Sequence, residues 1–423
     1  MTDRRHLALR EILTPHKPPS VTTEAGTTVR FAGVRWYGLG LFIREERDGA
    51  DVPGKCFPLK PGALVYNRLF AWKQSFAVVT DDFDGVFVSN EFPQFDVDPL
   101  CATPEFVALY CSSPRFAELA KGESTGAAAV SRNRLKEADF LELPIELPSL
   151  RAQETIVDIM GRVTDAANTA DAEADALRAV LRLRRAELIA GVDADPVRAD
   201  SAFDIRLGRQ RSPERATGPS MTPYMRSANV GYDELRMDDV LSMDFNERER
   251  ERYRLLDGDV LVSEGSASPT AVGMPAVWHD ELDGPICFQN TLLRYRAIDG
   301  VTIPAFVRHW CLWAFESGEF RETAGDAPGV RHIGFRKASA MSVRLPDLDE
   351  QEEIANVLGP MADAVAALRA EAERLLTLRG ALLEALLAGD VTLTPGDGAF
   401  STIHPPAPDA QPQMKENTVD CST

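Results

Sequence analysis

Two long stretches of the chain carry apolar residues at alternating steps of three and four positions. This spacing places the apolar side chains along one face of a helix and is typical of a coiled-coil seam. We therefore expect two long helices that pair with each other, and the alanine-rich first stretch should permit a close approach. The expected seam positions are Ile156, Ile159, Val163 and Leu177 in the first stretch, and Ile354, Leu358, Met361, Val365, Leu368, Leu375, Leu382 and Leu386 in the second.

The two stretches are copies of each other. Residues 147–156 return without a gap as residues 345–354, a shift of 198 positions, and the same register holds to Gly191 and Gly389. A period of about 200 residues is longer than any solenoid unit, so the chain should contain two complete modules, each ending in a long helix. We expect a pseudo-two-fold molecule in which the two helices form an antiparallel coiled coil.

Local signals indicate where the second helix begins and where it breaks. Asp347 followed by Glu350 is the pattern of a capping box, so a helix should start just after Asp347. Gly359 and Pro360 predict the end of a short leading helix, because proline lacks an amide donor and disfavours helix at the residue before it.

The two globular regions, residues 1–146 and 192–344, contain short predicted strands separated by glycine and proline. Each also contains an amphipathic helix, starting near Pro104 and Pro304, and Asn90 matches Asn290 at the same shift of 200 positions. The predicted fold class is α+β, with mixed short strands and a few helices. The globular regions differ far more than the helices do. Two surfaces that do the same job on different targets would explain this, and neutral drift of loops is the alternative.

We divide the chain into a first globular domain (1–146), a first helix (147–191), a second globular domain (192–344), a second helix (345–391) and a tail (392–423) that is expected to be disordered. Residues 362–387 would form a rod of roughly 40 Å, because a helix rises 1.5 Å per residue. Such a rod could hold two binding modules a fixed distance apart, or it could be a helical hairpin with no measuring role.

The charge of the chain argues at first against a nucleic-acid partner. The net charge is −19, whereas phosphate contacts need Lys and Arg. However, residues 345–423 hold 4 cations and 14 carboxylates, 4 − 14 = −10, so more than half of the excess lies in the second helix and the tail. The cations of the globular regions are mostly Arg, which suits bidentate contact with phosphate and guanine.

The sequence favours a cytoplasmic protein without chemistry of its own. It has no apolar stretch of the roughly 20 residues that span a membrane, no signal-peptide core, and no Cys pair or His cluster at metal-ligand spacing. Phosphate-binding glycine loops, nucleophile elbows, zinc-binding His pairs and the Asn/Asp-Pro-Pro-aromatic segment of adenine methyltransferases are also missing. His309 lies in an apolar helix and is expected to be a buried residue rather than a catalyst. We expect no metal and no cofactor on this chain.

The chain resembles the specificity subunits of type I restriction-modification enzymes. The resemblance is carried by the doubled Leu-Pro-x-Leu-x-x-Gln-Glu-x-Ile motif at 147–156 and 345–354, and by residues 223–230 and 256–265 of the second domain. It spans roughly residues 5–390. The first copy departs from the family pattern at Arg151 and Ala152, where an acidic pair is usual.

The resemblance implies a non-catalytic subunit that binds double-stranded DNA. Two target-recognition domains would each read one half-site, with a fixed non-specific spacer between the half-sites. The helices would act as the ruler and as the docking site for two methyltransferase subunits, which bind S-adenosylmethionine and methylate adenine. Restriction subunits would join the complex for cleavage. A duplicated scaffold that binds only proteins, and an enzyme with an unseen motif, are the alternatives.

Side chains that read DNA must reach base edges or phosphates, so we expect them among Arg, Lys, Asn and aromatic residues of the loops. Each of these side chains could equally be a solvated loop residue. The candidates are Trp36, Asn67, Arg68, Lys73, Arg132, Asn133 and Arg134 in the first domain, and Arg209, Arg211, Arg226, Asn229, Arg331 and His332 in the second.

Overall fold

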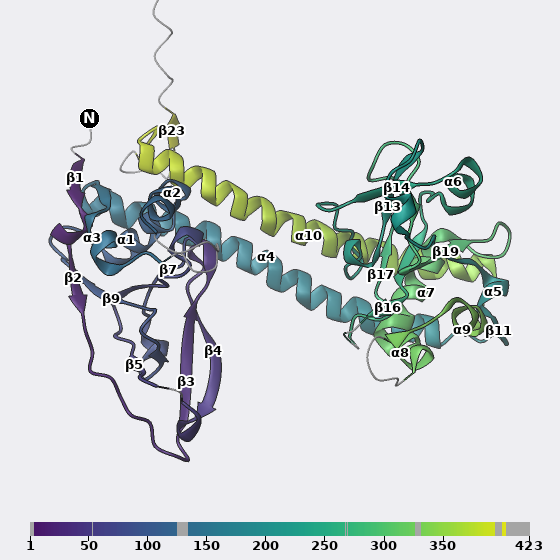
Figure 1. The fold of residues 1–423 in the computed structure, drawn as a ribbon, viewed down its shortest axis with the longest axis horizontal. Coiled ribbons are helices and arrows are strands. Elements are labelled where there is room, and N and C mark those ends of the chain that lie inside the picture. Colours follow the sequence, from purple (N-terminus) through teal and green to yellow (C-terminus); the bar gives the residue numbers. More distant parts are fainter. Residues whose placement is uncertain are drawn as a thin grey trace, which may run out of the picture. The chain divides into compact units, whose positions relative to one another are not determined.

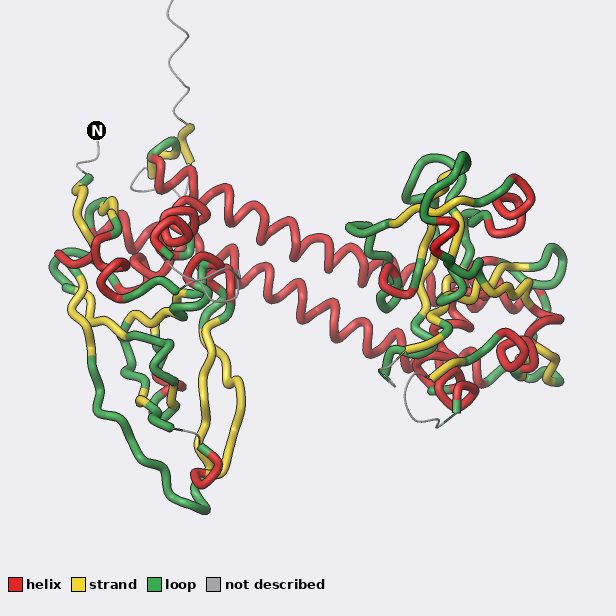
Figure 2. The backbone as a smooth tube through the Cα atoms, in the orientation of Figure 1, coloured by secondary structure: helices red, strands yellow, loops and turns green. Residues whose placement is uncertain are grey.

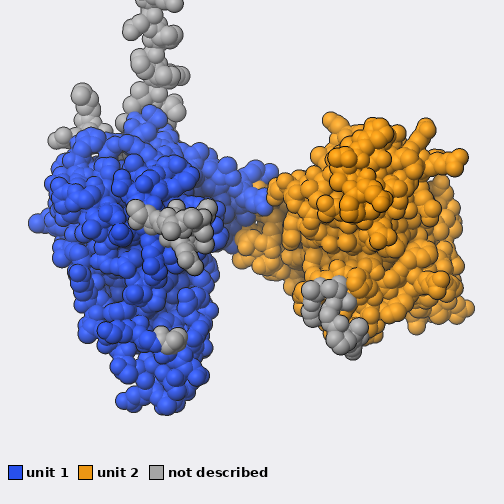
Figure 3. Space-filling model, in the orientation of Figure 1, with its two compact units in different colours: residues 1–168, 372–423 blue, residues 169–371 orange. Residues whose placement is uncertain are grey.

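The computed structural model describes residues 4–52, 54–124, 134–266, 268, 270–325, 331–393 and 400–402. They form two compact units (Figure 3). Unit 1 contains residues 1–168 and 372–423, and unit 2 contains residues 169–371. Two long helices, α4 (Leu150–Ala190) and α10 (Leu348–Ala388), each have 41 residues and contribute one half to each unit (Figure 1).

The two long helices pair within each unit. In unit 1, Met160 of α4 and Leu383 of α10 share a core, and further along α4 the hydroxyl of Thr164 accepts a hydrogen bond of 2.9 Å from the Arg379 Nε. Residue numbers therefore rise along α4 while they fall along α10. In unit 2, Arg369 forms ion pairs with Asp171 and Asp175. These contacts confirm the predicted antiparallel pairing of the helices.

The seam of the helix pair differs by about one position from the prediction. All predicted seam residues are buried or half-buried. However, the fully buried line along α4 continues from Ile156 through Met160, Ala167, Ala170, Ala174 and Leu181. Alanines also flank these buried positions. The sequence pattern therefore predicts which face of α4 is apolar, but not which residues on that face are most buried. The small side chains allow the partner helix to approach closely at the positions that packing selects.

The predicted break at Gly359 and Pro360 is wrong, because α10 continues through both residues. A proline inside a helix removes one backbone hydrogen bond and costs about 3 kcal/mol. Leu358 and Ala362 on either side of Pro360 are buried in the core of unit 2, and this packing offsets the cost. The predicted start of the helix is confirmed, since the Glu350 amide donates to the Asp347 carboxylate over 2.9 Å.

Domain 1 contains two four-stranded sheets and a short strand pair. In spatial order the first sheet is β2 (Leu13–His16), β9 (Gln94–Val97), β6 (Leu64–Tyr66) and β7 (Phe76–Val78), and the second is β4 (Leu41–Asp48), β3 (Thr28–Val34), β8 (Phe87–Val88) and β5 (Phe57–Pro58). Strand β1 (Arg5–Ala8) pairs with β10 (Pro144–Leu147). The helices are α1 (Pro104–Cys111), α2 (Pro114–Glu123) and α3 (Glu137–Glu142).

Domain 2 repeats most of this strand order, with one strand fewer in its second sheet. Figure 2 draws the helices and strands of both domains in separate colours. The first sheet of domain 2 is β12 (Phe203–Leu207), β19 (Leu292–Ala297), β15 (Val260–Ser263) and β17 (Pro275–Val277), and its second is β14 (Leu241–Asp244), β13 (Met221–Met225) and β18 (Cys287–Phe288). Strand β11 (Pro196–Arg198) pairs with β21 (Ser342–Arg344), and β16 (Gly265–Ser266) pairs with β20 (Arg331–His332). The helices are α5 (Ala199–Ala202), α6 (Glu247–Tyr253), α7 (Pro304–Ser317), α8 (Glu319–Ala324) and α9 (Phe335–Ala340).

The strand directions also repeat. Strand β3 is antiparallel to β4 and parallel to β8, and β13 is likewise antiparallel to β14 and parallel to β18. The predicted α+β class and the duplication of the globular domains are therefore confirmed. Where the tail is described, β22 (Val391–Leu393) pairs antiparallel with β23 (Phe400–Thr402), and the expected disorder of the tail stays a prediction. The remaining tail residues lie outside the described residues.

Candidate nucleic-acid interface

In domain 2, residues 289–291 connect three segments that carry predicted DNA-binding side chains. The Asn290 amide donates to the carbonyl of Arg209 over 3.1 Å. Thr291 accepts from two amides, through its hydroxyl from Ser227 (3.1 Å) and through its carbonyl from Glu264 (2.9 Å). The carbonyl of Glu264 in turn accepts from the amide of Ile333 over 2.9 Å. The loops at 209–211, 226–229 and 331–332 are therefore held together by one backbone junction.

Domain 1 contains the central two hydrogen bonds of this junction at equivalent positions. The Arg68 amide donates to the carbonyl of Glu91 over 2.9 Å, and the Leu135 amide donates to the carbonyl of Arg68 over 3.0 Å. Arg68 corresponds to Glu264 in the repeated topology, because each lies two residues beyond matched strand positions, Tyr66 and Val262. The two domains thus use one backbone arrangement to hold side chains of different charge.

At the junction of domain 1 the cations are paired with carboxylates. Arg134 binds Glu91 over 2.7 Å, and Arg68 forms an ion pair with Glu137. The side chain of Arg134 is about half exposed, and one oxygen of Glu91 is buried without a hydrogen-bond partner among the described residues. Arg134 is therefore positioned by Glu91 while its guanidinium stays accessible to a phosphate or a base edge.

Two other predicted residues of domain 1 line one cavity, and a third contacts one of them. Trp36 and Asn67 line a cavity of about 500 Å³. The Lys73 ammonium lies 3.5 Å from the centroid of the Trp36 ring, which is a close cation–π contact. The side-chain oxygen of Asn67 accepts from the Leu69 amide over 3.0 Å, which orients the side chain and leaves both N–H donors of its amide for another partner.

In domain 2, Arg209 is fixed by a carboxylate that it shares with Arg215. Both arginines contact Glu249 over 2.7 Å. Burial opposes ionisation of Glu249, but hydrogen bonds from Arg215, the Asn246 amide and Arg209 outweigh it, and they lower the pKa of Glu249. Arg211 is exposed and has no hydrogen-bond or ion-pair partner among the described residues. Arg211 is therefore the more accessible of the two predicted arginines.

Asn229 does not fit the predicted role. Its side chain is 1% exposed, its carbonyl accepts from the Arg226 amide over 3.1 Å, and its amide donates to the carbonyls of Arg236 (2.9 Å) and Asp239 (3.1 Å). A buried side chain with all these groups in use cannot reach a base edge, so Asn229 instead shapes the loop. The Arg226 side chain is 23% exposed and forms an ion pair with the exposed Asp239 of the same loop.

His332 and Arg331 lie on β20, beside the small residues Gly265 and Ser266 of β16. The Nδ1 atom of His332 lies 2.7 Å from a carboxylate oxygen of Glu264, and the imidazole is more than half exposed. Two other candidates, Arg132 and Asn133, and the glycine- and alanine-containing run before them lie outside the described residues.

Sequence reasoning considered cations and missed the groups that position them. Glu91, Glu249 and Glu264 each orient one of the predicted side chains, and Thr291 holds the junction together. The internal repeat could have indicated Thr291, because this residue directly follows Asn290, which matches Asn90 of the first domain. Ion-pair partners that are distant in sequence left no such signal.

Comparisons with known proteins identify the fold. No family model and no curated protein matches the chain by sequence. A solved chain described under the structural basis of assembly and conformational transition of the type I restriction-modification system matches with a TM-score of 0.56 and 18% identity, covering 91% of this chain and 97% of that chain. The type I specificity subunit from M. genitalium matches with a TM-score of 0.53 and 11% identity, covering 91% and 96%.

A third match is the HsdS subunit from Thermoanaerobacter tengcongensis, with a TM-score of 0.41, 19% identity, and coverage of 92% and 97%. The first two matches show that the chain has the fold of a type I restriction-modification specificity subunit, with tandem domains and two long paired helices. Within the described part of the chain, no helix could span a membrane, and no group of three or more His, Cys, Asp or Glu is placed to hold a metal.

Proposed function

We propose that this chain is the non-catalytic specificity subunit of a type I restriction-modification complex, in which each target-recognition domain reads one half of a bipartite DNA site. The observation that carries this proposal is the shared backbone junction. It places Arg68 and Arg134 in domain 1 but Glu264 and His332 in domain 2. Retained scaffolds with different side chains suit two readers of different sequences, since base readout depends on the donors and acceptors presented.

The long helices would set the spacer and dock the partners. A 41-residue helix is about 60 Å long. Both helices also expose large apolar side chains, with Leu183 of α4 74% exposed and Leu378 of α10 54% exposed. Exposed apolar side chains on a helix favour a protein interface. We assign this surface to two methyltransferase subunits, which would carry S-adenosylmethionine and methylate adenine, and restriction subunits would join them.

Two measurements test the proposed function. Long-read mapping of methylated adenines in the host should give a bipartite motif that disappears when this coding sequence is disrupted and returns when it is restored. Methylation unchanged by the disruption would refute the proposal. In addition, the purified chain with its methyltransferase subunits should shift duplex DNA in a gel, and the affinity should fall steeply between about 50 and 200 mM salt. Assembly with proteins but no DNA binding would favour the scaffold alternative.

A further inference from the structure

One loop of each domain is built from equivalent strands but held in different ways. It connects β13 to β14 in domain 2 (226–240) and β3 to β4 in domain 1 (35–40). In domain 2 the Asp233 amide donates to the carbonyl of Pro275, and in domain 1 the Gly38 amide donates to the carbonyl of Gln74, both over 2.9 Å. In both domains the loop is therefore anchored by one backbone hydrogen bond, to β17 in domain 2 and to the residues just before β7 in domain 1.

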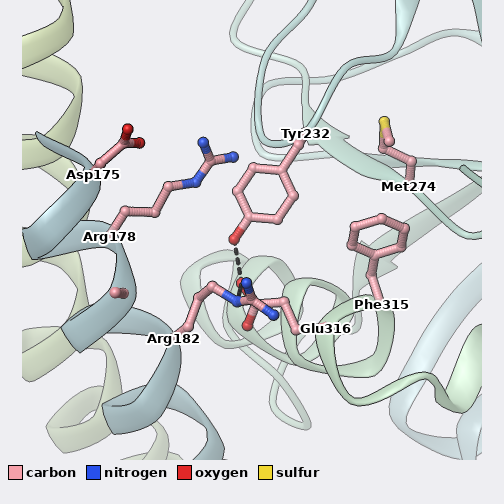
Figure 4. A pocket seen from close by; sticks show the side chains of 8 residues that line it. Asp175, Arg178, Arg182, Tyr232, Met274, Phe315 and Glu316 are labelled. Carbon is pink, nitrogen blue, oxygen red and sulfur yellow. Dashed lines mark hydrogen bonds and ion pairs between the residues drawn. The ribbon is translucent and has the colours of Figure 1, made fainter. Parts of the chain in front are cut away.

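In domain 2 two side chains of this loop, Tyr232 and Asp233, bind residues of helices α4 and α7. The Asp233 carboxylate accepts from the Arg308 Nε and Nη2 atoms over 3.1 and 2.8 Å. The Tyr232 hydroxyl donates to Glu316, and the Arg178 guanidinium lies 4.0 Å from the centroid of the Tyr232 ring (Figure 4). Tyr232 is therefore unavailable for an outside partner.

Among the described residues of domain 1, no such side-chain contacts hold the loop. The counterpart of Arg308, at the shift of 200 positions, is Ala108, which lies beside Gly38 without a charge to offer. The loop instead presents three large apolar side chains to solvent, Trp36 (41% exposed), Tyr37 (56%) and Leu39 (41%). Tyr37 also has a φ of 59°, a left-handed conformation that is unfavourable for a residue with a side chain.

The exposed loop borders the cavity of about 500 Å³ described above. Phe42, Phe70 and Phe92 line it together with Trp36 and Tyr37. The cations that line it are Arg35 and Arg44, the Lys73 ammonium lies against the Trp36 ring, and no carboxylate is among the lining residues. Arg44 pairs with Glu45, whereas Arg35 and Lys73 have no ion-pair partner among the described residues. In a chain of net charge −19, an aromatic cavity with a cationic rim matches a flat base next to phosphates.

We propose that domain 1 inserts Tyr37 between two base pairs of its half-site and that the displaced base occupies the cavity beside Trp36. Apolar wedges that part the base stack are a known means of DNA recognition. Domain 2, whose tyrosine is tied down, reads its half-site without displacing a base. The inference rests on the proposed DNA-reading function and adds a mechanism that differs between the two domains.

The test uses the full chain with its methyltransferase subunits, bound to DNA that carries the bipartite motif. Each adenine of the motif, except the methylated one, is replaced in turn by 2-aminopurine, which fluoresces when its neighbours unstack. The methylated adenine is left out because methyltransferases swing out their own target. Permanganate oxidation probes unstacked thymines in the same way, and the thymine opposite each methylated adenine and the bases beside that pair are left out for the same reason. We expect a several-fold signal at one step of the half-site read by domain 1 and none in the other half-site.

Three variants connect the signal to the loop. Tyr37→Gly removes the ring and suits the left-handed backbone, so the fold should persist while the signal disappears and affinity falls about 5- to 100-fold, the range for loss of one stacked base. Tyr37→Phe should keep the signal. Leu100→Ala, which truncates another exposed apolar side chain of unit 1 (82% exposed), should change neither quantity.

The outcomes separate this inference from the proposed function. If the complex methylates a bipartite motif, but no position unstacks and Tyr37→Gly binds like the wild type, the inference is overturned and the function stands. If no bipartite motif exists, the function fails. If Tyr37→Gly prevents assembly with the methyltransferase, the loop is a protein contact and the inference is overturned.

Discussion

Gln153 and Gln351 occupy equivalent positions in the two long helices and make the same three hydrogen bonds. The Gln153 side chain accepts from the Thr103 amide (3.1 Å) and donates to the carbonyls of Cys101 (3.1 Å) and Pro148 (2.9 Å). The Gln351 side chain accepts from the Ile303 amide (3.0 Å) and donates to the carbonyls of Val301 and Pro346 (both 2.9 Å). Each fully buried glutamine ties the start of a long helix to the segment before α1 or α7. These three hydrogen bonds explain why both copies of the motif contain a glutamine at this position.

Replacing either glutamine should destabilise the unit that contains it. Gln351→Leu would leave two carbonyls and one amide buried without partners, and each unsatisfied group costs about 1–3 kcal/mol. We expect a loss of at least about 3 kcal/mol in the free energy of unfolding, measured by urea denaturation. Glu352→Ala, a substitution at the exposed neighbouring position, should stay within about 0.5 kcal/mol. Equal stability of Gln351→Leu and the wild type would contradict the stabilising role of these hydrogen bonds.

His309 should make unit 2 sensitive to mild acid. Burial, together with the charges of Arg185 and Arg308, lowers the pKa of His309 from its ordinary 6.5 to about 3. The unfolded chain then binds a proton that the folded chain does not, so stability falls as pH drops below about 6.5. The loss attributable to this residue at pH 5 should be about 2 kcal/mol, because one pKa unit corresponds to about 1.4 kcal/mol.

The measurement for His309 compares urea unfolding of the wild type and of His309→Gln at pH 7 and pH 5. Gln cannot be protonated, so the pH-dependent difference between the two proteins isolates the imidazole. A difference that does not change between the two pH values would show that His309 is charged or hydrated in the folded protein.

Shortening both helices should shorten the spacer. Removing seven residues from α4 near Asp171 and seven from α10 near Arg369, which pair with each other, deletes about two turns and about 10 Å. The helix faces stay in register because seven residues are close to two full turns. Methylation mapping should give the same half-sites with a spacer about 3 base pairs shorter. If the spacer keeps its length, the helices are not the ruler.

Arg226 and Asn229 should behave differently although they share a loop. Arg226→Ala should alter or abolish recognition of the half-site read by domain 2, with assembly intact, because the partly exposed guanidinium and its partner Asp239 are the charged groups at this end of the loop. Asn229→Ala should destabilise the fold by about 2–3 kcal/mol, since it leaves three backbone groups of the loop without partners. Arg236→Ala removes a more exposed arginine of the same loop and serves as the control. Methylation maps and melting curves of the three variants separate the roles, and an unchanged motif in Arg226→Ala would remove this residue from the interface.

Much of the fold was predictable because its signals are local or repeated. The three-and-four spacing of apolar residues predicted both helices, and the shift of 198 positions predicted two equivalent modules. Asp347 correctly marked the start of α10 for the same reason, since a cap is formed by residues three positions apart. The break at Pro360 was mispredicted because the packing of Leu358 and Ala362 outweighs the local cost of a proline.

The candidate interface was predictable only in part. The sequence by itself determined which cations and aromatic residues the loops carry. Only the tertiary structure decided that Asn229 is enclosed, that Glu91 and Glu264 orient Arg134 and His332, and which tyrosine is exposed. Tyr232 is held by Glu316 and the neighbouring Asp233 by Arg308, and both partners lie more than 70 residues further along the chain. Ala108, the counterpart of Arg308 in domain 1, offers no charge to the loop that carries Tyr37. Contacts between such distant positions form only when the chain is folded, so no local pattern records them.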